Sequence, residues 1–175
     1  MRVKTLTPLF TVEQIDRRVR ELAGQINALY TGRQLVLICV LKGAFMFFSD
    51  LVKYVTVSVE LDFVRLASYG GSSFSSGVTF SKDVEISLAG KDVVLVEDIV
   101  DSGHTMDFLL RRMKAYGANS LRVAALVDKV ERREVPVQLD FVAFPLLSGF
   151  IVGYGLDYAE RYRELPAIYT ATLEE

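Results

Sequence analysis

Three short apolar runs, at residues 35–41, 93–96 and 121–127, constrain the fold of this chain more than any other feature. They are rich in valine, isoleucine and leucine, which is typical of strands that are buried on both faces. Between the second and third runs, apolar residues recur at helical spacing over 106–113, and this helix is predicted to end near Gly117. The order strand, helix, strand predicts a parallel sheet with right-handed crossovers.

Two further helices are predicted in the first third of the chain. Thr11 and Gln14 have the spacing of a capping box. Behind them, apolar residues recur at steps of three and four over residues 12–29, which predicts one buried stripe on a helix. A second helix, rich in aromatic residues, is expected over 44–53.

Alternation and loop composition predict the remaining elements. Residues 57–63 alternate between apolar and polar, as in a strand with one solvated face. Two weaker strands are expected near 139–144 and 150–154. Residues 68–77 are too rich in serine and glycine to pack as a helix or a central strand. Such a loop is either a lid over a ligand site or the tip of a hairpin, and its composition alone does not decide between them.

Length and charge limit the classes of function. The 175 residues predict one domain, covering 1–175. The 20 basic and 22 acidic residues give a net charge of −2, which argues against a general nucleic-acid binder. Cys39 is the only cysteine, lies in an apolar run and is interpreted as a small buried hydrophobe. We expect a cytoplasmic protein with no disulfide, no signal peptide and no membrane span.

The stretch of residues 93–105 carries the chemistry. A buried strand ends in two acids, and a small-residue turn containing Gly103 leads into the next helix. Ligands of open α/β sheets bind at the carboxyl ends of the strands. The N–H groups of such a turn and helix start can cradle a phosphate, and the hydroxyl groups of Ser102 and Thr105 can add hydrogen bonds. The glycine and lysine spacing of a P-loop is absent from this segment.

The two acids are Glu97 and Asp98. Neighbouring side chains on a strand point to opposite faces, so these two carboxylates are not required to touch. They could accept hydrogen bonds from a sugar diol, with a divalent cation nearby to offset their charge. Acid pairs at strand ends also serve as ordinary turn and cap residues, and the pair alone leaves both interpretations open.

The segment 94–105 resembles the phosphoribosyl-pyrophosphate signature of type I phosphoribosyltransferases, and its form is most similar to that of the hypoxanthine-guanine phosphoribosyltransferases. Segments 41–44, 127–129 and 150–163 are similar to the same subfamily. The resemblance implies a type I phosphoribosyltransferase-like α/β fold. In that fold a central, mostly parallel sheet is flanked by helices, and the terminal segments form a small hood over its carboxyl edge.

The resemblance also implies roles for the residues around the signature. Asp101 would be the catalytic general base or proton relay at N7 of the purine. Glu97 and Asp98 would bind the ribose hydroxyls and help to hold Mg²⁺. The 5′-phosphate would be bound by Ser102, Gly103, His104 and Thr105. Pyrophosphate would meet Lys42 and Gly43, with the Leu41–Lys42 peptide bond in the cis form.

Further implied roles belong to the lid and to the last third of the chain. Ser68 and Tyr69 would begin a lid covering about 68–82. The other implied contacts are Lys129 with O6 of the base, Phe150 stacked on the base, Ile151 bound to it through backbone groups, Asp157 as a Mg²⁺ ligand, and Arg163 with pyrophosphate. Taken one at a time, Lys129 could instead be a solvated charge, Phe150 a core aromatic and Arg163 part of a surface ion pair.

The chain departs from the subfamily pattern at two positions and in the composition of the lid. His104 stands where several relatives carry lysine, and either phosphate contact or simple exposure is expected for it. Val130 replaces a proline that is frequent after the Asp-Lys pair. The lid is unusually rich in serine.

The reaction implied by the resemblance joins hypoxanthine or guanine to phosphoribosyl pyrophosphate, giving IMP or GMP and pyrophosphate. Lys129 argues against adenine, whose exocyclic amine is a donor. A preference for xanthine stays open. An RNA-binding regulator of the same fold is a further alternative, but it would need a basic face that the charge balance does not favour. A homodimer or homotetramer is implied by the family.

Overall fold

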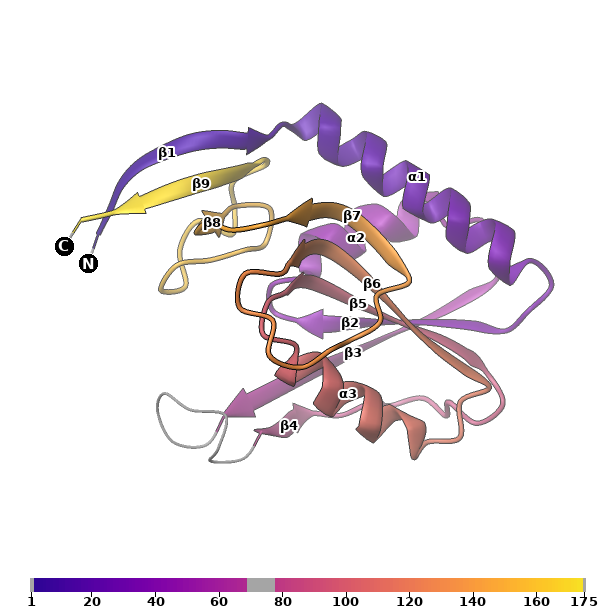
Figure 1. Ribbon diagram of the computed structural model, residues 1–175. Coiled ribbons are helices and arrows are strands. Elements are labelled where there is room, and N and C mark those ends of the chain that lie inside the picture. Colours follow the sequence, from indigo (N-terminus) through magenta and orange to yellow (C-terminus); the bar gives the residue numbers. More distant parts are fainter. Residues whose placement is uncertain (1, 69–77, 175) are drawn as a thin grey trace.

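The computed structural model describes residues 2–68 and 78–174, which form two sheets flanked by helices (Figure 1). In chain order the elements are β1 (Val3–Phe10), α1 (Val12–Tyr30), β2 (Leu35–Leu41), α2 (Phe45–Tyr54), β3 (Val59–Ser68), β4 (Val78–Lys82), β5 (Asp92–Val100), α3 (His104–Lys114), β6 (Ser120–Lys129), β7 (Phe141–Leu146), β8 (Ile151–Val152) and β9 (Ile168–Leu173). None of the helices in this part of the chain combines the length and the apolar character needed to cross a membrane.

The larger sheet has the strand order β4-β3-β2-β5-β6-β7. All its neighbouring strands run parallel except β4, which joins the edge antiparallel to β3. Alternate residues of the central strands face different layers. Leu37 of β2 packs in a core with α1 and α2, whereas Ile38 packs in a second core with α3. The predicted mostly parallel sheet, flanked by helices, is therefore confirmed.

The helix α1 begins as the capping box predicts. The N–H of Thr11 donates to Oε1 of Gln14 at 2.8 Å, and the N–H of Gln14 donates to Oγ1 of Thr11 at 3.3 Å. These bonds satisfy two N–H groups at a helix start, where intrahelical acceptors are missing. Ile15, Val19 and Ile26 are buried on the predicted stripe.

The smaller sheet, with the order β1-β9-β8, is the hood predicted from the terminal segments. β1 and β9 pair antiparallel, from Val3 against Leu173 to Phe10 against Ile168, so the two ends of the chain lie side by side (Figure 1). The sequence pattern predicts neither of these strands, nor β4. Most residues of β1 and β9 stay at least partly exposed, and each finds its partner at the opposite end of the chain.

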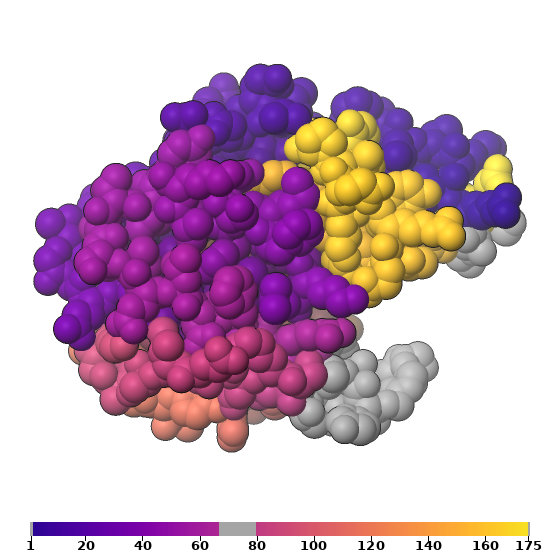
Figure 2. All heavy atoms as spheres, turned by 180° about the vertical axis from the view of Figure 1, so that it is seen from behind, coloured from indigo at the N-terminus to yellow at the C-terminus, as the bar shows by residue number. Residues whose placement is uncertain are grey.

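The hood contacts the larger sheet and its helices through aromatic residues. Phe10 stacks on Phe144 of β7 with ring centroids 4.0 Å apart. Tyr154 donates its hydroxyl hydrogen to Oδ2 of Asp50 in α2 at 2.6 Å. Burial, and then the bond to Asp50, raise the pKa of the Tyr154 phenol, so it remains a donor at neutral pH. From behind, Figure 2 shows the yellow atoms of the hood directly against purple atoms of the first third of the chain.

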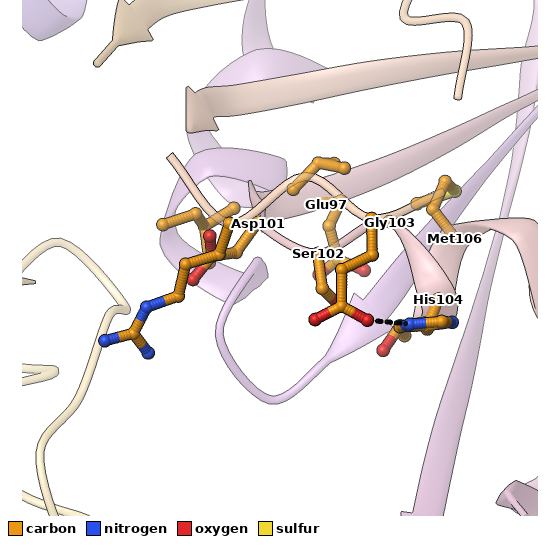
Figure 3. Close-up of a pocket in the computed structure, with 11 residues that line it drawn as sticks. Glu97, Asp101, Ser102, Gly103, His104 and Met106 are labelled. Carbon is orange, nitrogen blue, oxygen red and sulfur yellow. Dashed lines mark hydrogen bonds and ion pairs between the residues drawn. The ribbon is translucent and has the colours of Figure 1, made fainter. Parts of the chain in front are cut away.

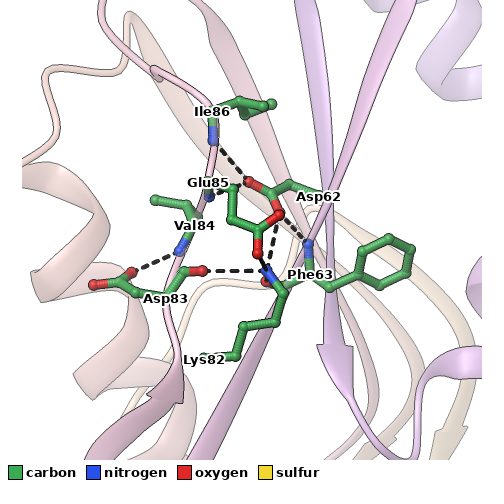
Figure 4. A network of polar contacts seen from close by, with 7 residues as sticks. All are labelled: Asp62, Phe63, Lys82, Asp83, Val84, Glu85 and Ile86. Carbon is green, nitrogen blue, oxygen red and sulfur yellow. Dashed lines mark hydrogen bonds and ion pairs between the residues drawn. The ribbon is translucent and has the colours of Figure 1, made fainter.

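A buried carboxylate anchors the chain that follows β4 (Figure 4). Asp62 of β3 accepts hydrogen bonds from the N–H groups of Phe63 at 2.7 Å, Glu85 at 2.7 Å and Ile86 at 3.1 Å. Lys82 lies 3.5 Å from the same carboxylate. Burial alone would raise the pKa of Asp62, but these donors outweigh burial and the pKa is lowered from 3.8.

We expect Asp62→Asn to lower the free energy of unfolding at pH 7 by about 1–3 kcal/mol, because one oxygen becomes an N–H₂ group facing backbone donors. Since the folded pKa of Asp62 lies below its unfolded value of 3.8, its stabilisation is complete above that value. The difference between wild type and variant should therefore shrink as the pH falls below 3.8. Urea unfolding between pH 7 and pH 3 measures both effects.

Glu85→Gln is the matched control, because the Glu85 side chain is exposed and its backbone N–H is kept. It should change the free energy of unfolding by less than about 0.5 kcal/mol. An equal loss in both variants would show that the buried acceptor has no special weight.

Candidate active site

Two cavities open at the carboxyl ends of the central strands. The first, of about 550 Å³, is lined by the end of β5, the turn after it and the start of α3, together with Arg132 and Glu134. The second, of about 560 Å³, lies between that strand end, the end of β6 and the chain around β8. Ile99, Asp101 and Arg132 line both cavities. Asp101 therefore stands between two spaces that are each large enough for part of a ligand.

The turn at residues 101–104 leads directly into α3 and forms the wall of the first cavity (Figure 3). Gly103 has φ +91°, and a Cβ there would lie 2.3 Å from the carbonyl oxygen of Val135. Only glycine fits such a position without strain. No side chain caps the N-terminus of α3 at Gly103. Ser102, Gly103, His104 and Thr105 all line this cavity, as the phosphate cradle predicts.

His104 has a partner that the sequence did not reveal. Its Nε2 atom lies 2.7 Å from a carboxylate oxygen of Glu134, and Figure 3 marks this contact with a dashed line. The N–H groups of Glu134 and Val135 both donate to the carbonyl oxygen of Ser102, at 2.9 and 3.0 Å. The chain after β6 thus braces the turn from outside.

The two acids at the end of β5 interact with each other. Glu97 is only 7% exposed, and the N–H of Asp98 donates to Oε1 of Glu97 at 3.2 Å. Burial, and then the charge of Asp98, raise the pKa of Glu97 well above its usual range. Burial likewise raises the pKa of Asp98. The expectation that neighbouring strand residues keep their carboxylates apart does not describe this pair, whose charges are coupled.

The donor set at this edge of the sheet fits Mg²⁺. Asp98 and Asp157 line the second cavity and Glu97 the first, so carboxylate oxygens face both spaces. Among the described residues no group of three or more His, Cys, Asp or Glu side chains is placed to hold a metal. Mg²⁺ commonly takes one or two carboxylates and completes its shell with water and phosphate oxygens. The coupled, buried acids are also a pair that a cation would stabilise.

Two glycines bring the end of β2 against the acids and the hood. The Leu41–Lys42 peptide bond is cis, as expected. A Cβ on Gly43 would lie 1.7 Å from Oδ2 of Asp98, and a Cβ on Gly155, at φ +98°, would lie 2.0 Å from the carbonyl oxygen of Gly43. Side chains at either position would separate these three segments.

The second cavity holds the residues expected around a base. Lys129 is 7% exposed, and its Nζ atom lies 3.5 Å from Oδ2 of Asp101 and 3.7 Å from Oε2 of Glu131. The other oxygen of Asp101, Oδ1, is buried and accepts no hydrogen bond from another described residue. Phe150 is 38% exposed and meets the Tyr158 ring edge-on, with centroids 5.4 Å apart. Ile151 also lines this cavity.

A network of charges lies where β2 meets the loop that follows β8. Nζ of Lys42 lies 2.9 Å from Oε2 of Glu160. Arg163 contacts the same Glu160 oxygen at 3.5 Å and Oδ1 of Asp157 at 2.8 Å. The hydrogen bond from Lys42 lowers the pKa of Glu160. Nε of Arg163 is buried without a hydrogen-bond acceptor among the described residues.

The lid predictions fall mostly outside the described residues. Ser68 is the last residue of β3, and the structure describes its backbone but not its side chain. Tyr69 lies outside the described residues, as does the remainder of the loop up to residue 77. The final part of the predicted 68–82 lid is the strand β4.

Sequence reasoning missed one residue that organises the site. Arg133 donates from Nε to the carbonyl oxygen of Asp101 at 2.7 Å, and from Nη2 to the carbonyl oxygen of Val100 at 2.9 Å and to Oδ1 of Asp128 at 2.5 Å. A longer contact of 3.4 Å reaches the carbonyl oxygen of Lys129. One guanidinium thus ties the turn after β5 to the end of β6. The sequence shows two adjacent arginines and gives no reason to separate them.

Comparisons with known proteins place these cavities in context. Residues 9–159 match the family described as the phosphoribosyl transferase domain. The hypoxanthine-guanine phosphoribosyltransferase of Streptococcus thermophilus (strain CNRZ 1066) is 42% identical over 168 residues, which cover 95% of this chain and 92% of that protein. The protein of the same name from Bacillus subtilis (strain 168) is 42% identical over 161 residues, covering 91% of this chain and 89% of that protein.

Among solved structures, a hypoxanthine-guanine phosphoribosyltransferase from Bacillus anthracis superposes with a TM-score of 0.90 at 38% identity, covering 98% of both chains. A hypoxanthine phosphoribosyltransferase from Staphylococcus aureus superposes with a TM-score of 0.91 at 37% identity, covering 97% of this chain and 92% of that one.

We expect Arg133→Gln to lower the free energy of unfolding by about 2 kcal/mol, because partly buried carbonyl oxygens and Asp128 lose charged donors. Hydrogen exchange at the amides of residues 101–103 should quicken at the same time. Arg132→Gln is the control, since Arg132 is exposed and no hydrogen bond or ion pair joins it to another described residue. That variant should stay within about 0.5 kcal/mol of wild type. Equal losses in the two variants would contradict the bracing role.

Proposed function

The chain belongs to the phosphoribosyltransferase family, as an enzyme of its hypoxanthine-guanine group, and from this premise we propose the reaction and the roles of its residues. The enzyme transfers the 5-phosphoribosyl group of phosphoribosyl pyrophosphate to hypoxanthine or guanine, in the presence of Mg²⁺, and releases pyrophosphate. The observation that carries the proposal is the position of Asp101. Its buried Oδ1 lacks a hydrogen-bond donor, and the residue stands between the two cavities.

The first cavity suits the phosphate end of the substrate. The uncapped N-terminus of α3 offers N–H groups and a partial positive charge. Ser102 and Thr105 add hydroxyl groups, and Gly103 allows the backbone to approach closely. His104 contributes its backbone N–H, because its ring is held by Glu134. The 5′-phosphate would bind in this cavity.

The acids would hold the ribose and the metal. Glu97 and Asp98 would accept hydrogen bonds from the ribose hydroxyls, and together with Asp157 they would hold Mg²⁺, directly or through water. The ion would supply positive charge to the departing pyrophosphate. Binding of a cation also relieves the repulsion that raises the pKa of Glu97.

The second cavity suits a 6-oxopurine. Phe150 presents an exposed ring for stacking. Lys129 would donate to O6, and the backbone of Ile151 would bind the opposite edge of the ring system. Oδ1 of Asp101 would accept the proton at N7 as the bond from the base to C1 of the ribose forms. Asp101 Oδ2 and Lys129 are only 3.5 Å apart, so one substrate can meet both side chains.

The departing pyrophosphate would lie near Lys42, Gly43 and Arg163. Bond breaking at C1 of a ribose passes through an oxocarbenium-like centre, as in glycoside hydrolysis. Such a reaction requires aligned reactants, neutralised charge on the leaving group and exclusion of water. The segment that begins at Ser68 and Tyr69 would exclude water as a lid.

The alternatives receive less support. Adenine would present a donor to Lys129 rather than an acceptor. Xanthine differs from the proposed bases at C2, where backbone groups decide, and it remains a second candidate substrate. For an RNA-binding regulator, the balance of 20 basic against 22 acidic residues offers no basic excess. We also propose that the enzyme works as a homodimer or homotetramer in the cytoplasm.

The test is pyrophosphate release from phosphoribosyl pyrophosphate with Mg²⁺ and each of hypoxanthine, guanine, xanthine and adenine. We expect turnover with the first two, loss of turnover with a chelator and recovery on addition of Mg²⁺. Activity confined to adenine would overturn the role of Lys129. No turnover with any base would contradict the proposed reaction, and RNA binding at several salt concentrations would then test the regulator.

Lys129→Gln should lower kcat/KM for hypoxanthine by about 10- to 100-fold, because a charged hydrogen bond to the base is lost. The KM for phosphoribosyl pyrophosphate should change little. Lys114→Gln, at the exposed end of α3, removes the same charge away from both cavities and serves as the control. A drop that affects both substrates equally would argue for a general loss of folding and against contact with the base.

A further inference from the structure

Glu160 lies on a loop whose backbone is fixed in an uncommon shape. Ala159, Glu160 and Tyr162 have φ of 52°, 63° and 75°, although none is glycine. Residues other than glycine occupy this region at a cost of about 1–2 kcal/mol each. The N–H of Glu160 donates to Oδ2 of Asp157 at 2.9 Å, which holds the turn closed. Left-handed residues of this kind concentrate at sites where geometry serves function.

The Glu160 carboxylate is placed between two cations. One of its oxygens lies 2.9 Å from Nζ of Lys42 and 3.5 Å from Arg163. Lys42 follows β2 and Arg163 belongs to the chain between β8 and β9, and nothing else listed by proximity in the described network bridges them as Glu160 does. The Glu160 side chain is 65% exposed, so it can move away without breaking the core. These two cations are the ones that the proposed function assigns to pyrophosphate.

We propose that Glu160 is an internal counter-anion, which occupies the pyrophosphate position in the free enzyme and is exchanged for pyrophosphate during the reaction. This inference rests on the proposed function, because it takes Lys42 and Arg163 as the pyrophosphate ligands. Two cations that face one anion site repel each other, and a carboxylate between them keeps both side chains in place. Pyrophosphate carries more negative charge than one carboxylate and displaces it.

The exchange weakens the binding of pyrophosphate and speeds its release. Each contact that pyrophosphate gains with Lys42 or Arg163 replaces a contact with Glu160, so the net gain is smaller than the new contact alone. As pyrophosphate departs, Glu160 pairs again with the same cations. Product release limits turnover in many enzymes, so a residue that hastens it acts on the rate without touching the reacting atoms.

The experiment measures the binding of inorganic pyrophosphate by calorimetry at fixed Mg²⁺ and low salt. Glu160→Gln removes the charge, and Glu160→Gly removes it in a residue that suits φ of 63°. Both variants should bind pyrophosphate about three- to tenfold more tightly than wild type, in line with the strength of exposed ion pairs. The gain should shrink as the salt concentration rises. Thermal unfolding of each variant shows that it is folded.

Glu164→Gln is the matched control, because it removes an exposed acid from the same segment and no ion pair joins Glu164 to Lys42 or Arg163. Its dissociation constant should equal that of wild type. An active wild type whose Glu160 variants bind pyrophosphate no more tightly than Glu164→Gln would overturn the inference alone. Weaker binding in the Glu160 variants would also overturn it, since Glu160 would then support the site. A wild type that neither turns over any base nor binds pyrophosphate would overturn the proposed function, and the inference with it.

Discussion

The burial of β5 between β2 and β6 is the constraint on which the site depends. Residues 93–96 are fully buried, and Val96 is paired with Cys39 on one side and Ala124 on the other. A strand held on both sides delivers the next two residues, Glu97 and Asp98, to a fixed place at the sheet edge. Burial there raises the pKa of Glu97 and, through the nearby acids, also helps to raise the pKa of Cys39 to about 12. The apolar run and the acid pair therefore form one device: the first fixes the position, and the second makes it demand a cation.

Close approach of backbone segments completes that device. Gly43, Gly103 and Gly155 each stand where a Cβ would lie within 2.3 Å of a neighbouring atom. Gly43 and Gly155 join the end of β2 to Asp98 and to the hood, while Gly103 lets the chain after β6 reach the phosphate turn. Arg133 then ties that turn to the end of β6 with hydrogen bonds of 2.5–2.9 Å. Segments distant in sequence meet because small residues permit contact and one guanidinium holds it.

The sequence predicts the parts of this molecule whose physics is local. The runs at 35–41 and 93–96, the capping box at Thr11 and the turn at Gly103 each display their structure in a few neighbouring residues, and the structure has them as predicted. β1 and β9 could not be found in this way, because a half-exposed strand becomes a strand only beside its partner. The roles of Arg133 and Glu160 were hidden for the same reason: their partners lie on other elements. The coupling of Glu97 to Asp98 depends on burial at a strand end, where alternation along the strand is a poor guide.

Charge in the site is balanced internally, and this balance shapes how it can bind anions. Lys42 lies beside Glu160, Arg163 beside Asp157, and Lys129 beside Asp101. With a net charge of −2, the protein as a whole does not attract an anionic substrate, so binding depends on these local cations. Each of them must loosen or share an existing carboxylate partner when a ligand arrives. Affinity is then a difference between two similar contacts, which favours moderate binding and ready release. An enzyme that must bind a highly charged substrate and let go of a highly charged product is served by that arrangement, because cations without partners would hold both too tightly.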